Sequence, residues 1–485
     1  MQNVLNEFIN YDDQVCNYKL ESKSIDENLT VHHYKIQSQK WPTHEVPTIP
    51  STIWVHNLTI YMPTFLKHNK VLLCVSGGYG TGKEGQEEWL KPKELFDFAK
   101  MATTNMALVV NLQNVPNQFL FINGTAKKGE QILAYTYKLF IEDPIKNIYL
   151  PGHLPMAKAI IKAMDATEQI LQEEHSTEVD SFVLSGISKR GWASWLAAIE
   201  DDRVSAIIPV AIDILNVQKS IIHICGVYKD GCPYALRDYK EEGITELISG
   251  QGFAELMKIE DPFSYLGEEY HSKYKEQFTK LTKYIINSSG DDFFVPDCSK
   301  FYFKDLPGDT NYIRYLPNSL HYLRGNFISD ATSNLQKVEN AISSFFYFTS
   351  NNVKLPKVSY NYYNGSIFVN SSLTPKAAIL WSCNNEYERD FRFLSSYSNW
   401  HLFKKKIVSF FSSELCDRCF DQQKVGFETN ADAKAQVVAI LPSFEQGWQA
   451  SFLELHYNVD DHEFVITTEV NLVSANSSAD FNDEL

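Results

Sequence analysis

Ser188 has the sequence surroundings of a catalytic nucleophile. It follows a run of strand-forming residues and precedes a helical pattern, within the stretch Gly-Ile-Ser-Lys-Arg-Gly at 186–191. In a nucleophile elbow the serine occupies a sharp turn between strand and helix, and small residues two positions before and after it let the turn close. Gly186 fits the first of these places, but Arg190 holds the second and the glycine comes one position later. The alternative is a serine that only caps the helix that follows.

An acid and a histidine follow Ser188 along the chain. His321 comes after the eighth expected strand, and Asp291 and Asp292 come after the seventh. Asp213, after the sixth strand, is a third candidate for the acid; alternatively, the aspartate pair only caps the next helix. The order serine, acid, histidine, each at the carboxyl end of a strand, is that of a hydrolase triad. In such a triad Ser188 attacks a carbonyl carbon, His321 transfers the proton, and the acid orients the imidazole.

A glycine-rich stretch after an apolar, strand-like run offers backbone donors. In hydrolases of this kind the loop at this place binds the oxyanion, so we expect the N–H groups of Gly78 or Tyr79 and of Lys189 to stabilise the transition state. The rival interpretation is a phosphate loop, because the stretch 77–83 fits G-x-x-x-x-G-K. The next residue, however, is Glu84 and not the serine or threonine that would bind Mg²⁺. We therefore expect no nucleotide and no other cofactor.

Two positive residues directly follow Ser188, at the N-terminus of the expected helix. The helix dipole disfavours Lys189 and Arg190 at this end, so a negative group should compensate them. The candidates are a buried partner such as Asp213 and an acidic group of the substrate.

The histidines and cysteines do not indicate a metal site. His32 and His33 are neighbours on a predicted strand, where their rings point to opposite faces and cannot bind one ion together. The Cys-x-x-Cys pair at 416–419 lacks a second pair or a histidine at zinc-finger spacing, which favours a disulfide or two free thiols. Cys225 and Cys232 are near enough in the sequence to close a small disulfide loop.

Strand-like and helical runs alternate from the start of the chain to about residue 350, which is typical of a mainly parallel sheet with helices on both faces. Eight strands are expected, near residues 31–36, 53–61, 71–75, 107–111, 182–186, 206–212, 284–287 and 312–315. Apolar residues at steps of three and four predict helices around 192–199 and 335–345. The charged and aromatic stretch 216–282 predicts a helical insertion or cap. We expect residues 1–350 to form one α/β domain.

The pattern changes after residue 354. Short alternating runs with turns between them, such as 453–457 and 464–468, predict an antiparallel β-sandwich over 355–473. A polar tail follows at 474–485.

The composition argues against two classes of partner. The 485 residues carry a formal net charge of −16, so the molecule repels phosphate and no nucleic acid partner is expected. The apolar runs are shorter than the ~18 to 20 residues that a membrane span needs. We therefore expect no membrane span.

The sequence carries mixed signals of location. The first fifteen residues lack the basic and apolar parts of a secretory signal. The chain ends in Asn-Asp-Glu-Leu, one residue different from an endoplasmic reticulum retrieval signal. Glycosylation sequons begin at Asn28, Asn57, Asn123, Asn287, Asn364, Asn370 and Asn476. The retrieval-like end and the sequons favour secretion or the lumen of the secretory pathway.

Three stretches are distinctive: Gly-Ile-Ser-Lys-Arg-Gly-Trp at 186–192, Gly-Asp-Asp-Phe-Phe-Val-Pro-Asp at 290–297 and Pro-Asn-Ser-Leu-His at 317–321. Together with shorter matches along nearly the whole chain, they resemble the PhoPQ-activated pathogenicity-related protein family, which includes autocrine proliferation repressor proteins. Arg190 then belongs to the family's own form of the turn. The resemblance implies an α/β-hydrolase fold with an eight-stranded, mostly parallel sheet, a helical insertion and a C-terminal, immunoglobulin-like antiparallel β-sandwich. It also implies export, since members are commonly secreted.

Two functions from different classes follow. The first is a serine hydrolase that cleaves ester or amide bonds of a small molecule or a peptide, through Ser188, His321 and an aspartate. The second is a secreted signalling or binding protein that represses proliferation through a cell-surface receptor and keeps the hydrolase scaffold with little or no catalysis. The sequence does not fix the oligomeric state.

Overall fold

The computed structural model describes residues 3–78, 95–117, 120–122, 125–229, 231–323, 328–386, 389–391, 420–429 and 434–475. Some positions singled out in the sequence lie outside the described residues: Tyr79, Glu84, Asn123, the Cys-x-x-Cys pair at 416–419 and residues 476–485 of the tail. The chain divides into two units. The first consists of Met1–Ile222, Leu236–Lys283 and Asp305–Gly308, and the second of His223–Ala235, Tyr284–Lys304 and Asp309–Leu485.

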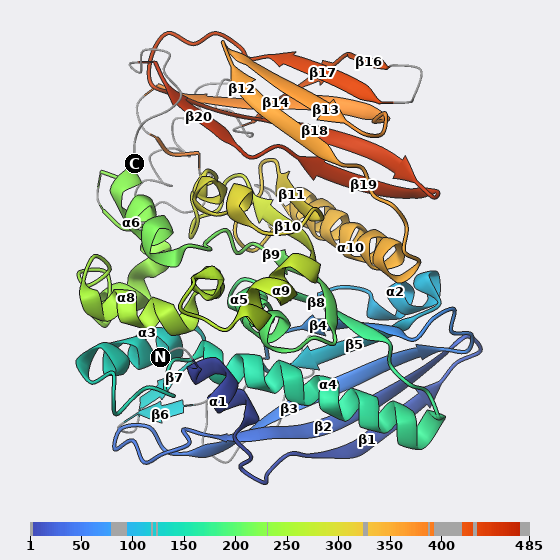
Figure 1. The fold of residues 1–485 in the computed structure, drawn as a ribbon, viewed down its shortest axis with the longest axis vertical. Helices are drawn as coiled ribbons and strands as arrows, with labels where there is room; N and C mark the ends of the chain where they lie inside the picture. Colours follow the sequence, from blue (N-terminus) through green and yellow to red (C-terminus); the bar gives the residue numbers. More distant parts are fainter. Residues whose placement is uncertain are drawn as a thin grey trace. The chain divides into compact units, whose positions relative to one another are not determined.

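A mixed sheet forms the centre of the first unit, with its strands in the order β1-β2-β3-β5-β4-β8-β9 (Figure 1). Neighbours from β1 to β5 pair antiparallel, and neighbours from β5 to β9 pair parallel. Strands such as Val-Leu-Leu-Cys-Val in β4 are apolar throughout because both faces of a parallel sheet are covered. The strands are β1 (Asn17–Ile25), β2 (Leu29–Trp41), β3 (Thr52–Pro63), β4 (Lys70–Val75), β5 (Leu108–Gln113), β8 (Ser181–Ile187) and β9 (Val204–Val210).

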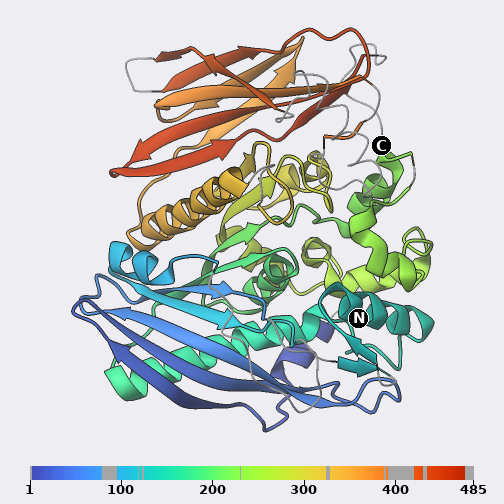
Figure 2. The same cartoon turned by 180° about the vertical axis from the view of Figure 1, so that it is seen from behind.

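Helices cover this sheet. Helix α4 (His153–His175) lies along β2, and α5 (Lys189–Glu200) packs beside α4 and against β8 and β9 (Figure 1). Figure 2 shows the opposite face of strands β1 to β3, with α4 behind them. Helix α1 (Val4–Asn10) packs on α4, and α2 (Phe98–Asn105) packs on β3 and β5.

Helices make up most of the described residues of the stretch 216–282. They are α6 (Val217–Val227), η1 (Tyr234–Leu236), α7 (Arg237–Glu241), α8 (Gln251–Glu260), η2 (Pro262–Leu266) and α9 (Ser272–Lys280). Cys225 and Cys232 form the disulfide expected from their spacing. In the sequence, three elements follow β5 and precede α4. They are the antiparallel pair β6 (Leu120–Ile122) and β7 (Thr125–Lys127), and helix α3 (Glu130–Glu142).

The second unit contains most of β10 (Thr282–Ser288), then η3 (Cys298–Phe301), most of η4 (Phe303–Asp305), β11 (Asn311–Leu316) and α10 (Ile328–Ser350). Two antiparallel sheets follow, with the orders β12-β13-β17-β16 and β15-β14-β18-β19, and β20 also pairs with β18. Figure 1 shows these sheets stacked on one another. Their strands are β12 (Val358–Tyr363), β13 (Ser366–Ser371), β14 (Ala377–Asn385), β15 (Asp421–Val425), β16 (Phe427–Thr429), β17 (Ala435–Ile440), β18 (Trp448–Val459), β19 (His462–Thr467) and β20 (Asn471–Ser474).

The predicted fold class is confirmed: a large mixed sheet with helices, of the α/β-hydrolase type, is followed by antiparallel sheets. A strand occurs at each of the eight expected places. Strand β1 was not predicted, because nearly all of its side chains are exposed and carry no apolar alternation. Among the described residues, no helix combines the length and the apolar character that crossing a membrane requires. The domain boundaries 1–350, 355–473 and 474–485 stay a prediction.

Candidate active site

Ser188 lies at the turn between strand β8 and helix α5. Its backbone has φ 60° and ψ −133°, a conformation that residues other than glycine rarely adopt and that costs about 1–3 kcal/mol. Its N–H donates to the carbonyl of Val210, at the end of β9, over 2.8 Å. Within the described residues its side chain makes no capping hydrogen bond to α5, and the residue is partly exposed. These features agree with a strained nucleophile turn and not with a simple helix cap.

Gly186 and Gly191 close this turn by direct approach of their backbones. A Cβ at Gly186 would lie 2.7 Å from the carbonyl carbon of Arg190 and 2.9 Å from the nitrogen of Gly191. A Cβ at Gly191 would lie 2.7 Å from the carbonyl oxygen of Gly186. Real side chains do not fit at such distances, so both positions require glycine. The residue that must be small is therefore 191, and Arg190 does not obstruct the turn.

The glycine-rich loop after β4 lies beside the same turn. A Cβ at Gly77 would lie 2.9 Å from the guanidinium carbon of Arg190. The Nε of Arg190 donates to the carbonyl of Val115 at 2.7 Å. Arg190 thus ties the turn at Ser188 to two loops at the carboxyl ends of β4 and β5.

Asn114 supports the loop from its other side. A Cβ at Gly78 would lie 3.0 Å from the side-chain oxygen of Asn114. The Nδ2 of Asn114 donates to the carbonyl of Val55 at 2.7 Å, and its carbonyl accepts from Nδ1 of His56 at 2.9 Å. Burial lowers the pKa of His56 to about 4, so that ring is neutral at pH 7. Gly78 therefore lies close to the uncharged side chain of Asn114, which leaves little room for a Cβ.

Glu130 balances the charge of Lys189. The Nζ of Lys189 pairs with one carboxylate oxygen of Glu130 at the start of α3, and the hydroxyl of Tyr239 donates to the other at 2.7 Å. Burial raises the pKa of Glu130, but the ammonium of Lys189 and the two hydrogen bonds outweigh it and lower the pKa to about 2. The carboxylate is therefore ionised at neutral pH, directly beside the residue that follows Ser188.

A buried network fixes helix α5 behind the turn. The carboxylate of Glu260 pairs with Nδ1 of His153 and accepts from the hydroxyl of Tyr137 at 2.8 Å. The backbone carbonyl of Glu260 accepts from the indole Nε1 of Trp192 at 2.6 Å. The ring of His153 stacks on Trp192, with centroids 4.3 Å apart. This network holds Trp192, and with it the first turn of α5.

His321 and Asp291 are brought together in the second unit. The Nδ1 of His321 lies 2.9 Å from Oδ2 and 3.2 Å from Oδ1 of Asp291, and both side chains are buried. The rings of Phe293 and Phe294 lie against the imidazole, with centroids 4.4 and 5.6 Å away. A carboxylate at Nδ1 makes this nitrogen the protonated one, which leaves Nε2 as a base.

Hydrogen bonds join the two loops that carry this pair. The Oγ of Ser288 lies 2.9 Å from that of Ser319 and donates to the carbonyl of Leu320 at 2.9 Å. The N–H of Gly290 donates to the carbonyl of Ser319 at 3.0 Å. The loop after β10 and the loop after β11 therefore fix the positions of Asp291 and His321 relative to each other.

The candidate acids occupy different places. Asp291 faces the imidazole of His321, and its Oδ1 accepts from the N–H of Phe293 at 2.7 Å. Burial, and after it the charge of Asp291, raise the pKa of Asp292. Asp213 is buried in the first unit, after β9. Geometry therefore favours Asp291 as the partner of the histidine.

The candidate residues form two groups. Ser188, Gly77, Gly78, Lys189 and Arg190 belong to the first unit, whereas Asp291, Asp292 and His321 belong to the second.

Sequence reasoning missed the supporting residues Glu130 and Glu260. The partners lie 59 positions apart for Glu130 and Lys189, and 107 positions apart for Glu260 and His153. One local feature of the sequence marks Glu260: it is an acidic residue among the aromatic and apolar residues of the helical stretch.

The chain matches known proteins over most of its length. A family model described as "PhoPQ-activated pathogenicity-related protein" matches residues 5–392. Autocrine proliferation repressor protein A of Dictyostelium discoideum is 29% identical over 328 residues, which are 67% of this chain but only 62% of that protein.

The structure is also similar to solved structures of esterases. Acetyl xylan esterase 1 from Thermoanaerobacterium sp. JW/SL YS485 is 14% identical over 69% of this chain and 91% of its own, with a TM-score of 0.37. The acetyl xylan esterase from Paenibacillus sp. R4 is 13% identical over 70% and 92% of the two chains, with a TM-score of 0.43. Because the family model covers well over half of the sequence, the chain belongs to the PhoPQ-activated pathogenicity-related protein family.

Proposed function

We propose that the chain is a serine hydrolase that cleaves ester or amide bonds of a small molecule or a peptide. The observation that carries the proposal is the strained turn at Ser188, closed by two glycines that cannot be replaced. Backbone strain of this kind persists only where the surrounding structure enforces it, and it is typical of functional sites. The buried pair of Asp291 and His321 supplies the base that such a serine needs.

In the proposed mechanism, the Oγ of Ser188 attacks the carbonyl carbon of the substrate while Nε2 of His321 takes its proton. Asp291 keeps the proton of His321 on Nδ1 and stabilises the imidazolium that forms. The imidazolium then protonates the leaving alcohol or amine, and a water molecule, activated by the same nitrogen, releases the acyl group from Ser188.

The oxyanion of the intermediate is assigned to backbone N–H groups. The donors are that of Lys189, in the first turn of α5, and that of Gly78 or Tyr79 in the glycine-rich loop. One such donor contributes about 3 kcal/mol to transition-state stabilisation. The ammonium of Lys189 is engaged with Glu130, so the side chain does not serve as the donor.

Hydrolysis of p-nitrophenyl acetate and of peptide p-nitroanilides by the purified chain tests the proposal. Ser188→Ala should abolish turnover, and Asp291→Asn should lower kcat about 10⁴-fold because the imidazole loses its orienting carboxylate. Asp292→Asn is the matched control, and it should keep most of the activity. A folded wild-type chain without activity on any of these substrates, or equal losses in the two aspartate variants, would contradict the assignment.

A second function rests on the name of the relative from Dictyostelium discoideum, a repressor of proliferation. In this proposal the chain acts outside the cell by binding a receptor. Its hydrolase scaffold then supplies the binding surface and has little or no catalytic activity. Growth of cells treated with wild-type chain and with Ser188→Ala separates the two functions. Equal repression by both favours the signalling role, and repression by the wild type alone favours hydrolysis.

A further inference from the structure

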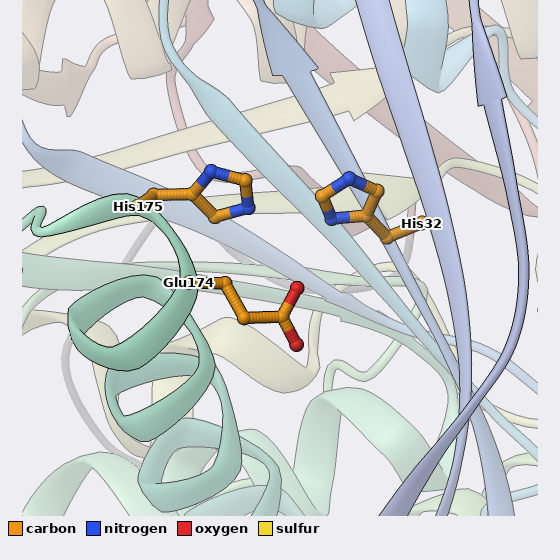
Figure 3. Close-up of side chains that lie close together, drawn as sticks. All are labelled: His32, Glu174 and His175. Carbon is orange, nitrogen blue, oxygen red and sulfur yellow. The ribbon is translucent and has the colours of Figure 1, made fainter.

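Three potential metal ligands meet where the C-terminal end of α4 packs against strand β2, away from the groups described above. They are His32 on β2 and Glu174 and His175 in the last turn of α4, and their ligand atoms lie within 4.8 Å of one another. The two imidazole rings are nearly parallel, at 16°, with centroids 5.1 Å apart. In Figure 3 a nitrogen of each ring and the carboxylate of Glu174 face a common space.

The ring of His32 is buried without a hydrogen-bond partner. The residue is 1% exposed, and neither of its ring nitrogens has a partner among the described residues. The Nε2 of His175 also lacks one there. Leaving a buried polar group unpaired is costly, and such a group in a native structure calls for an explanation. A bound cation would give one nitrogen of each ring a partner at once.

The neighbouring groups fit such a ligand. An imidazole that carries no proton on one of its nitrogens offers a lone pair to a metal ion there. The hydroxyl of Tyr34 donates to Oε1 of Glu174 at 2.9 Å, which orients the carboxylate and leaves Oε2 open. The negative end of the α4 dipole also favours a cation at this position.

We propose that His32, Glu174 and His175 bind a divalent transition-metal ion, Zn²⁺ in the first place. Two imidazole nitrogens and one carboxylate oxygen suit this class of ion, with water in the fourth position. Tetrahedral ligands around Zn²⁺ lie roughly 3.3 Å apart, so ligand atoms that lie within 4.8 Å of one another must approach by up to about 1.5 Å. Glu174 is exposed and His175 partly exposed, and rotation about their side-chain bonds allows this closure.

A positive group opposes the ion. Lys23 on β1 stands directly across from His32 in the strand register, and its positive charge repels a cation at this place. Its side chain is exposed and can turn into solvent. Removing its charge should therefore tighten the binding of the metal, an effect that a purely structural role of these residues does not predict.

Titration of the chelator-treated full chain with Co²⁺ tests the site, because tetrahedrally bound Co²⁺ absorbs visible light. We expect one equivalent to bind, and Zn²⁺ to displace it. Glu174→Gln and His175→Ala change exposed or partly exposed residues and should weaken the affinity at least tenfold, by analogy with losses of about 10–100-fold for weaker perturbations of metal sites. Lys23→Gln should strengthen it.

Two matched controls lie on the same elements. His33→Ala changes the next residue on β2, whose ring bonds to Thr59 on the other face. Glu173→Gln changes the neighbouring acid on α4, which accepts from Tyr18. Both controls should bind Co²⁺ like the wild type. Absence of saturable Co²⁺ binding by the wild type, or equal affinity in the Glu174 and His175 variants, overturns the proposal.

Discussion

Replacement of Glu130 by glutamine tests the electrostatics beside Ser188. Glutamine keeps an acceptor for the hydroxyl of Tyr239 but removes the negative charge that faces Lys189. The side chains of Glu130 and Lys189 are 16% and 12% exposed, so water screens the charges of this pair only little. The variant leaves an ammonium group largely buried without its counter-ion, which should destabilise the fold.

The size of the effect follows from the pKa of Glu130. This pKa falls from an ordinary 4.5 to about 2 in the folded chain. At about 1.4 kcal/mol for each tenfold change in proton affinity, the carboxylate contributes about 3 kcal/mol to folding. Because the folded-state pKa is the lower one, this stabilisation is present above about pH 4.5 and is lost as the pH falls toward 2. By about pH 3.5, a substantial part of it should have disappeared.

Equilibrium unfolding in urea, followed by tryptophan fluorescence, measures the difference. Glu130→Gln should cost about 3 kcal/mol at pH 7, and the gap to the wild type should narrow in acid. Glu255→Gln is the control, because its ion pair with Lys258 lies at the surface and should be worth less than about 0.5 kcal/mol. A Glu130 variant as stable as the wild type at pH 7, or a gap that does not change with pH, refutes the reasoning.

Two further substitutions, the first with a control variant, test the turn and its support. Gly186→Ala places a methyl group 2.7 Å from the backbone of Arg190, so it should cost at least about 2 kcal/mol in thermal unfolding and abolish ester hydrolysis. Gly226→Ala, where the added group meets nothing within 4 Å in the described part of the chain, should be neutral or stabilise helix α6 by up to about 1 kcal/mol. Tyr137→Phe removes a donor to the buried Glu260 and should cost about 1–3 kcal/mol in urea unfolding; no measurable loss would show that the network does not hold α5.

The turn at Ser188 and most of the strands could be predicted because their causes are local. A glycine before the serine and a glycine after it are needed for backbones that nearly touch, and both appear in the sequence within a few positions. A strand such as β4 is buried on both faces and therefore appears as a continuous apolar run. An exposed edge strand such as β1 carries no such signal.

The choice between neighbouring aspartates could not be made from the sequence. Asp291 and Asp292 have the same side chain and adjacent positions, so the pattern fits either. The difference lies in the backbone: the loop after β10 directs the N–H groups of Phe293 and Phe294 to Asp291, and this fixes its carboxylate toward His321.

Contacts between segments far apart in the sequence could not be predicted from local patterns either. The rule that neighbouring residues on a strand point to opposite faces correctly separates His32 from His33. It does not reveal that the last turn of α4 brings Glu174 and His175 to His32, because that depends on how the helix packs on the sheet. In the same way, the anion next to Lys189 comes from α3, which no spacing in the sequence indicates.

The proposed mechanism requires that the imidazole of His321 activate the hydroxyl of Ser188. Reaction with a fluorophosphonate, followed by mass spectrometry of the digested chain, measures this directly. We predict a covalent adduct on Ser188 in the wild type and a rate of labelling at least about 100-fold lower in His321→Asn. A folded wild type that forms no adduct at Ser188, or a His321 variant that reacts at the wild-type rate, would contradict the claim.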